Sequence, residues 1–99
     1  MEKHTPHYPL AEILMQMAEV QAMNLTVSAR HGIRAAGLGM ADALRVIQSL
    51  KRRDFYKSMT THADHRVWQD VYHGEWQGLA LYIKFQRVGD YFVVSFKEL

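Results

Sequence analysis

The feature that most constrains the fold is a pair of strand-like segments joined by the dipeptide Gly89-Asp90. Apolar and polar side chains alternate in residues 79–88 and 91–97, and a glycine-first pair between such segments favours a two-residue type II′ hairpin. This turn sets the register by placing Val88 opposite Tyr91. It predicts two apolar and two polar cross-strand pairs: Ile83 with Phe96, Phe85 with Val94, Lys84 with Ser95, and Tyr82 with Lys97. Because the apolar face suits packing on helices, the polar pairs are predicted on the opposite, open face.

The first half of the chain has the periodicity of helices, with apolar residues at three- and four-residue spacing. Pro9 suits a first helical position, and Thr26 or Ser28 can cap a later helix. Three helices are expected, over residues 10–20, from Thr26 or Ser28 to the glycines at 37 and 39, and over residues 40–50.

The second half has the composition of strands. Residues 67–72 are β-branched and aromatic, and residues 55–61 suit a short strand or an extended loop. Gly74 and Gly78 are expected to bracket a loop. In that loop, Trp76 could stack on a nucleobase or pack locally, whereas Trp68 is expected in the core. The prediction is one α+β domain, residues 1–99, with N-terminal helices packed on a largely antiparallel C-terminal sheet.

Composition excludes several classes of protein. The 99 residues contain no cysteine, so neither a disulfide framework nor a thiolate metal site is expected. No apolar run is long enough to cross a membrane, and no signal peptide is recognised, which suits a cytoplasmic location. The net charge of +2 permits a polyanionic partner without requiring one.

Two groups of polar residues allow more than one interpretation. Five cations lie between Arg45 and Lys57, where they suit either a solvated helix end or a phosphate-binding surface. His4 with His7, and His62 with His65, have H-x-x-H spacing. These pairs could supply zinc ligands, although exposed histidines without a metal are the simpler interpretation.

Four segments of the chain resemble one known family. They are the opening MEK followed by Thr5-Pro6-His7, the sequence DFYKSMTT at residues 54–61, DHxxWQDVY at residues 64–72, and VSFKE at residues 94–98. Together they are similar to the MqsR toxins, small endoribonucleases of bacterial toxin–antitoxin pairs. Residues 10–50 match in pattern only. The resemblance implies a RelE-like architecture.

The resemblance also implies a site. It places functional residues at Lys57, Gln69 and Tyr82, with Lys97 a further candidate. Residues expected to bind RNA or shape the site are Tyr56, Met59, His7, His65 and Lys84. RNA supplies its own nucleophile, the ribose 2′-hydroxyl, so the protein needs only a base, an acid and cations. We expect the lysines to stabilise the phosphorane, Gln69 to orient the nucleotide, and Tyr82 to exchange a proton with a pKa lowered by a nearby cation.

The implied function is sequence-specific, metal-independent cleavage of messenger RNA that blocks translation, with no cofactor. An MqsA-type antitoxin is the implied protein partner, and no membrane is involved. Two alternatives remain open: a non-catalytic RNA- or ribosome-binding module on the same scaffold, and a zinc protein with histidine ligands.

Overall fold

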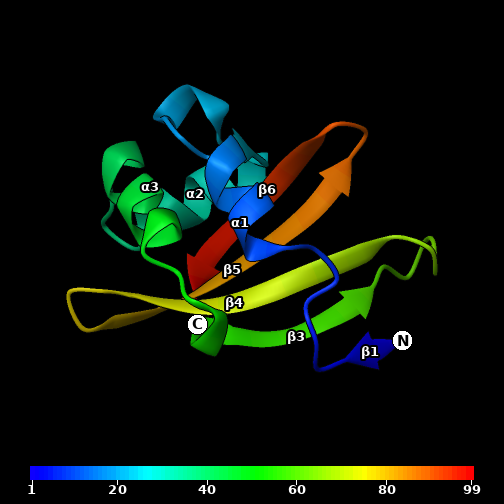
Figure 1. The fold of residues 1–99 in the computed structure, drawn as a ribbon. Coiled ribbons are helices and arrows are strands. Elements are labelled where there is room, and N and C mark those ends of the chain that lie inside the picture. The colour runs from blue at the N-terminus through cyan, green and yellow to red at the C-terminus, as the bar shows by residue number, and fades with distance from the viewer.

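A six-stranded sheet in the order β1-β3-β4-β5-β6-β2 forms the centre of the computed structural model, which describes residues 1–99 (Figure 1). Its strands are β1 (Glu2–Lys3), β2 (Asn24–Leu25), β3 (Phe55–Thr60), β4 (Trp68–Trp76), β5 (Leu79–Val88) and β6 (Tyr91–Glu98). The helices are α1 (Leu10–Gln16), α2 (Val27–Ala35) and α3 (Met40–Gln48), with 3-10 turns η1 (Val20–Ala22) and η2 (Arg52–Asp54). All strand pairs are antiparallel except β2 with β6, so the predicted α+β class is confirmed.

The β5–β6 hairpin has the predicted register. Val88 lies opposite Tyr91 and Tyr82 opposite Lys97. Gly89 has a φ of 61°, which the first central position of a type II′ turn requires. Ile83, Phe85, Val94 and Phe96 are all buried on the other face of the hairpin.

The predicted loop between Gly74 and Gly78 is wrong, because β4 continues through Gly74 to Trp76. Gly74 lies against the core, where an added Cβ would come within 3.0 Å of Val46 and 3.1 Å of Ile83. Its role is therefore close packing rather than a break in the strand. The turn itself is formed by Gln77 and Gly78, with φ of 49° and 85°, so Trp76 belongs to the strand and packs against the core.

The helix boundaries depend on contacts far along the chain. α1 stops at Gln16, short of the predicted residue 20. The side-chain amide of Gln48 donates to the carbonyl of Met17 at 3.0 Å. The side chain of Gln16 donates to the carbonyl of Asp90 and accepts from the backbone amide of Phe92, both in the β5–β6 hairpin. These contacts hold the chain in a non-helical path. Thr26 caps α2 by accepting from the Ala29 amide at 3.0 Å, as one of the two predicted caps.

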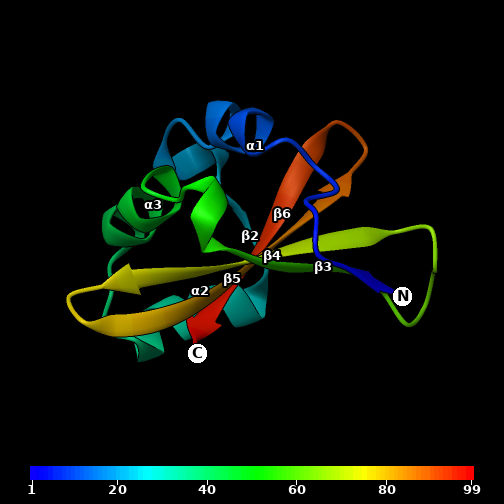
Figure 2. The ribbon, with the colours of Figure 1, turned by 60° about the horizontal axis from the view of Figure 1, so that its bottom comes forward.

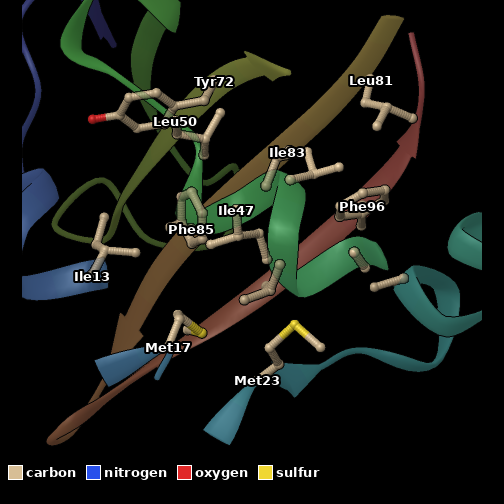
Figure 3. Close-up of a cluster of buried hydrophobic side chains, with 14 of the residues drawn as sticks. Ile13, Met17, Met23, Ile47, Leu50, Tyr72, Leu81, Ile83, Phe85 and Phe96 are labelled. Atoms are coloured by element: carbon tan, nitrogen blue, oxygen red, sulfur yellow. The ribbon is translucent and has the colours of Figure 1, made fainter. Parts of the chain in front are cut away.

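Helices α1 and α3 cover one face of the sheet, and α2 lies beside the C-terminal end of β6 (Figure 2). Ile13 of α1, Ile33 of α2 and Ile47 of α3 are fully buried in one cluster with the sheet. Figure 3 shows Ile47 beside Phe85 of β5. The predicted packing of N-terminal helices on the sheet is confirmed. No helix is long and apolar enough to span a membrane.

Two short strands were not predicted. β1 pairs with β3 at one edge of the sheet, and β2 pairs in parallel with β6 at the other. Each has two residues, too few to show an alternating pattern. Only the neighbouring strands make these segments extended.

Candidate active site on the open face of the sheet

The face of the sheet opposite α1 and α3, termed here the open face, collects side chains from every long strand. Because side chains alternate along a strand, the register assigns each residue to one face. Across β3, β4, β5 and β6 the register gives three rows of open-face residues: Met59, Gln69, Gln86 and Val93; Lys57, Val71, Lys84 and Ser95; and His73, Tyr82 and Lys97. Tyr56 lies where the register of β3 shifts between Phe55 and Lys57, and it joins the third row by stacking on His73. Seven of the nine predicted site residues are among them.

Lys57 occupies one side of this face and forms an ion pair. Its Nζ lies 2.6 Å from Oε1 of Glu2, and it also lies 5.6 Å from the centre of the Tyr56 ring. The Lys57 side chain is only 23% exposed, against 54% for Glu2. The hydrogen bond to Glu2 raises the pKa of Lys57, so its ammonium is retained at all physiological pH values.

The expected lowering of the Tyr82 pKa is wrong. Lys57 does lower the pKa of Tyr82, but burial acts in the opposite direction and is the larger effect, so the pKa is raised above 10.0. The expectation included the effect of the neighbouring cation on the pKa but not the desolvation of the phenol. Tyr82 therefore keeps its proton at neutral pH and can donate it.

A hollow of about 220 Å³ lies beside Tyr82, lined by Ser28, Tyr82, Lys84, Ser95, Phe96 and Lys97. Nζ of Lys97 stands 5.2 Å above the Tyr82 ring. Burial and the charge of Lys97 both lower the pKa of Lys84. A half-buried cation, Lys84, and an exposed one, Lys97, line the same hollow and form a suitable site for a phosphate. Ser28 at the start of α2 lines this hollow, so the open face is bordered by a helix and is not wholly free of helices.

Gln69 and Met59 lie side by side at the other end of the face. Nε2 of Gln69 donates to Oε1 of Gln86 at 2.8 Å. This bond orients both amides along the surface. An amide fixed in this way can hydrogen-bond to a nucleobase edge.

The structure places His7 and His65 apart from the open face. The His7 ring stacks on Trp68 on the helical side of the sheet, with centroids 5.3 Å apart, and its Nδ1 accepts from Nζ of Lys3 at 2.9 Å. Burial first, then Lys3, lowers the pKa of His7. His65 is exposed in the loop between β3 and β4.

Part of the matched sequence is structural. Asp70 is fully buried on the helical side and accepts from the Ser58 hydroxyl at 2.6 Å and from the Tyr8 amide at 2.9 Å. The amide of His7 donates to the same carboxylate. Asp70 thus fastens the N-terminal segment across β3 and β4. That contact positions β1 at the edge of the sheet.

His73 is an open-face residue that the sequence analysis missed. It is the cross-strand partner of Tyr82, and its ring stacks on Tyr56 with centroids 4.4 Å apart. Its Nε2 is buried without a hydrogen-bond partner. Alternation from Gln69 through Val71 would have predicted its position, but the strand was expected to end at residue 72. Glu2 was also missed, since nothing in a two-residue strand indicates its pairing.

No group of three or more His, Cys, Asp or Glu side chains converges on one point. The two H-x-x-H pairs therefore do not come together as one set of ligands.

Two comparisons with known proteins indicate the family of the chain. A family model described as motility quorum-sensing regulator, toxin of MqsA, matches residues 5–98. The chain is also 39% identical, over 98 residues, to the mRNA interferase toxin MqsR of Escherichia coli strain K12; the match covers 99% of both chains.

Proposed function

The chain belongs to the MqsR toxin family, and from this premise we propose that it is an endoribonuclease that cleaves messenger RNA. The observation that carries the proposal is the convergence of Lys57, Tyr82 and Lys97 on one face, which also presents Gln69. The lysines supply the cations and Tyr82 supplies a protonated phenol as the acid, two of the three groups that metal-independent RNA cleavage requires; the third is a general base.

In the proposed reaction the ribose 2′-hydroxyl gives up its proton to a general base, and O2′ attacks the adjacent phosphorus. Lys57 and Lys97 stabilise the charge on the phosphorane oxygens. Tyr82 donates its proton to the leaving 5′-oxygen, which its raised pKa permits at neutral pH. The products are a 2′,3′-cyclic phosphate and a 5′-hydroxyl, and no metal takes part. Gln69 holds the nucleotide beside the scissile bond and contributes to the sequence preference.

We propose further that the protein is the toxin of a toxin–antitoxin pair, acts in the cytoplasm and is neutralised by an MqsA-type antitoxin. The family description as a toxin of MqsA supports this partner. A pI near 9.0 suits binding of RNA.

The test is to incubate the purified protein with a long RNA in EDTA and to map the new ends. We expect cleavage at a limited set of sites and 2′,3′-cyclic phosphate termini. Cleavage that EDTA abolishes and Zn²⁺ restores would contradict the metal-independent mechanism. RNA binding without any cleavage would instead identify a non-catalytic RNA-binding module.

A further inference from the structure

The ion pair between Glu2 and Lys57 places a carboxylate within the cationic part of the open face. Glu2 lies opposite Met59 in the β1–β3 pairing, so it points to the same side as Lys57. Its Oε1 is 2.6 Å from Nζ of Lys57. A carboxylate at this position repels RNA phosphates, so a surface that only binds RNA gains nothing from it.

The N-terminal segment holds Glu2 in place from both sides. The terminal amino group donates to Oγ1 of Thr60 at 2.9 Å, and the Thr60 amide donates to the carbonyl of Met1 at 2.9 Å. Beyond β1, the amides of His7 and Tyr8 bind the buried carboxylate of Asp70. The position of Glu2 is therefore a property of the folded sheet rather than of a loose terminus.

The cross-sheet order of three side chains places a carboxylate and a phenol on opposite sides of Lys57. Glu2 is on β1, Lys57 on β3 and Tyr82 on β5, so Lys57 lies between the other two. The Lys57 charge reaches Tyr82, since it acts on the phenol. An ammonium has three donors, so Nζ can hold Glu2 and a phosphate oxygen together. A phosphate bound there has a carboxylate on one side and a phenol on the other, where the attacking and leaving oxygens must lie.

We propose that Glu2 is the general base of the cleavage reaction, a role that rests on the function proposed above. The Glu2 carboxylate removes the proton of the 2′-hydroxyl as O2′ bonds to phosphorus. The bond from phosphorus to O5′ breaks, and Tyr82 transfers its proton to O5′. Glu2 then holds the added proton and Tyr82 lacks one, and exchange with water restores both.

The ionisation of these groups agrees with that assignment. The hydrogen bond and charge of Lys57 hold the pKa of Glu2 below its ordinary 4.5, so the carboxylate is ionised throughout the neutral range. Burial holds the pKa of Tyr82 above 10.0. The rate of the chemical step should therefore be independent of pH between these limits.

The experiment measures single-turnover cleavage of a short RNA that carries a mapped site. The affinity for the same RNA, with a 2′-deoxy nucleotide at that site, is measured in parallel. We expect Glu2→Gln to slow cleavage roughly 10²–10⁴-fold while affinity stays equal or increases. Glu75→Gln removes one negative charge from the same face, further along β4. Glu12→Gln breaks a comparable surface ion pair, with Arg87 at 2.8 Å. Both controls should cleave at the parental rate.

Three results would overturn the proposal. Parental cleavage by Glu2→Gln would leave Glu2 as a counterion of Lys57. An equal loss of rate and of affinity would make it a positioning residue. A loss of cleavage rate in the unmodified protein as the pH is lowered below about 6.5 would assign the base to an imidazole. His73 is the candidate imidazole on this face. A parental protein that cleaves no RNA would instead refute the proposed function, before any variant is compared.

Discussion

At the residue scale, the open face shows that position in the sheet sets the chemistry of a side chain. Tyr82 and Tyr91 belong to the same hairpin, yet Tyr82 is partly enclosed between Lys97 and His73, whereas Tyr91 is 46% exposed at the hairpin tip. The two residues are of the same type, but their environments differ, and burial raises the pKa of Tyr82.

Replacing Tyr82 by Phe should separate binding from cleavage. The ring and its contact with Lys97 remain, and only the hydroxyl is lost, so the affinity for RNA should persist. The cleavage rate should fall roughly 10²–10⁴-fold, the usual contribution of a positioned proton donor. Tyr91→Phe makes the same chemical change outside the site and should have no effect. Parental cleavage by the Tyr82→Phe protein would exclude the phenol from the reaction.

The pH dependence of kcat/KM should follow the protonation of Tyr82. The reaction needs the protonated phenol, and burial raises its pKa above 10.0, so activity should be retained below that pH and lost above it. A rate profile, corrected for alkaline hydrolysis of the RNA, measures this limb. An alkaline limb near pH 8 would show that the phenol is more acidic than its burial implies.

The main effect of Lys57→Ala should be on RNA binding. Removing one cation that contacts a phosphate should weaken RNA binding and reduce the slope of log affinity against log salt by about 1. Arg45→Ala is the matched control, because it removes one charge from α3 on the helical side of the sheet. An unchanged slope for Lys57→Ala, or an equal reduction in both variants, would contradict a specific phosphate contact at Lys57.

At the element scale, α2 packs closely against β6 because Gly32 has no side chain at the point of contact. A Cβ on Gly32 would lie 2.0 Å from the carbonyl oxygen of Phe96, and 3.1 Å from Cα of Lys97. The helix therefore packs directly on the strand that carries Lys97. This contact explains how α2 comes to border the hollow beside Tyr82.

Gly32→Ala should lower the free energy of unfolding by roughly 1–3 kcal/mol, because the helix must move away from β6. In an isolated helix the same change would be favourable by about 1 kcal/mol, so the sign is diagnostic. His31→Ala, at the neighbouring exposed position, should leave stability nearly unchanged. Denaturant unfolding measures both variants. A Gly32→Ala protein as stable as the parent would show that α2 is not tightly packed.

At the scale of the whole molecule, the sheet brings the two ends of the chain to one face, where the candidate site lies. Glu2 comes from the first strand and Lys97 from the last, and both lie on the open face with Lys57 and Tyr82 between them. Helices α1 and α3 cover the other face, and all three helices contribute to the core. Truncation at either end would therefore remove part of the site.

Expression of the protein without an antitoxin should stop bacterial growth and deplete messenger RNA. Co-expression of an MqsA-type antitoxin should restore growth. The Tyr82→Phe variant, expressed to the same level, serves as control and should be tolerated. Growth curves and RNA end mapping provide the readout. Normal growth at full induction of the parental protein would refute the toxin function.

The local pattern of the sequence determined several features by itself. The Gly89-Asp90 turn and the alternation around it were sufficient for the β5–β6 register, because a shift of one residue would bury lysines. The helical stripes and the two candidate caps, Thr26 and Ser28, could also be predicted, since both depend on residues only a few positions apart; the structure shows that Thr26 is the cap. The family resemblance pointed to Lys57, Gln69, Tyr82 and Lys97, whose roles remain proposals.

Only the tertiary structure decided which of these residues meet, because that depends on strands distant in the sequence. The continuation of β4 through Gly74 brought His73 beside Tyr82, and the two residues of β1 brought Glu2 to Lys57. The chain after β1 places His7 on the opposite side of the sheet, stacked on Trp68. The direction of the Tyr82 pKa shift is also a tertiary property, since desolvation depends on how the surrounding side chains enclose the phenol.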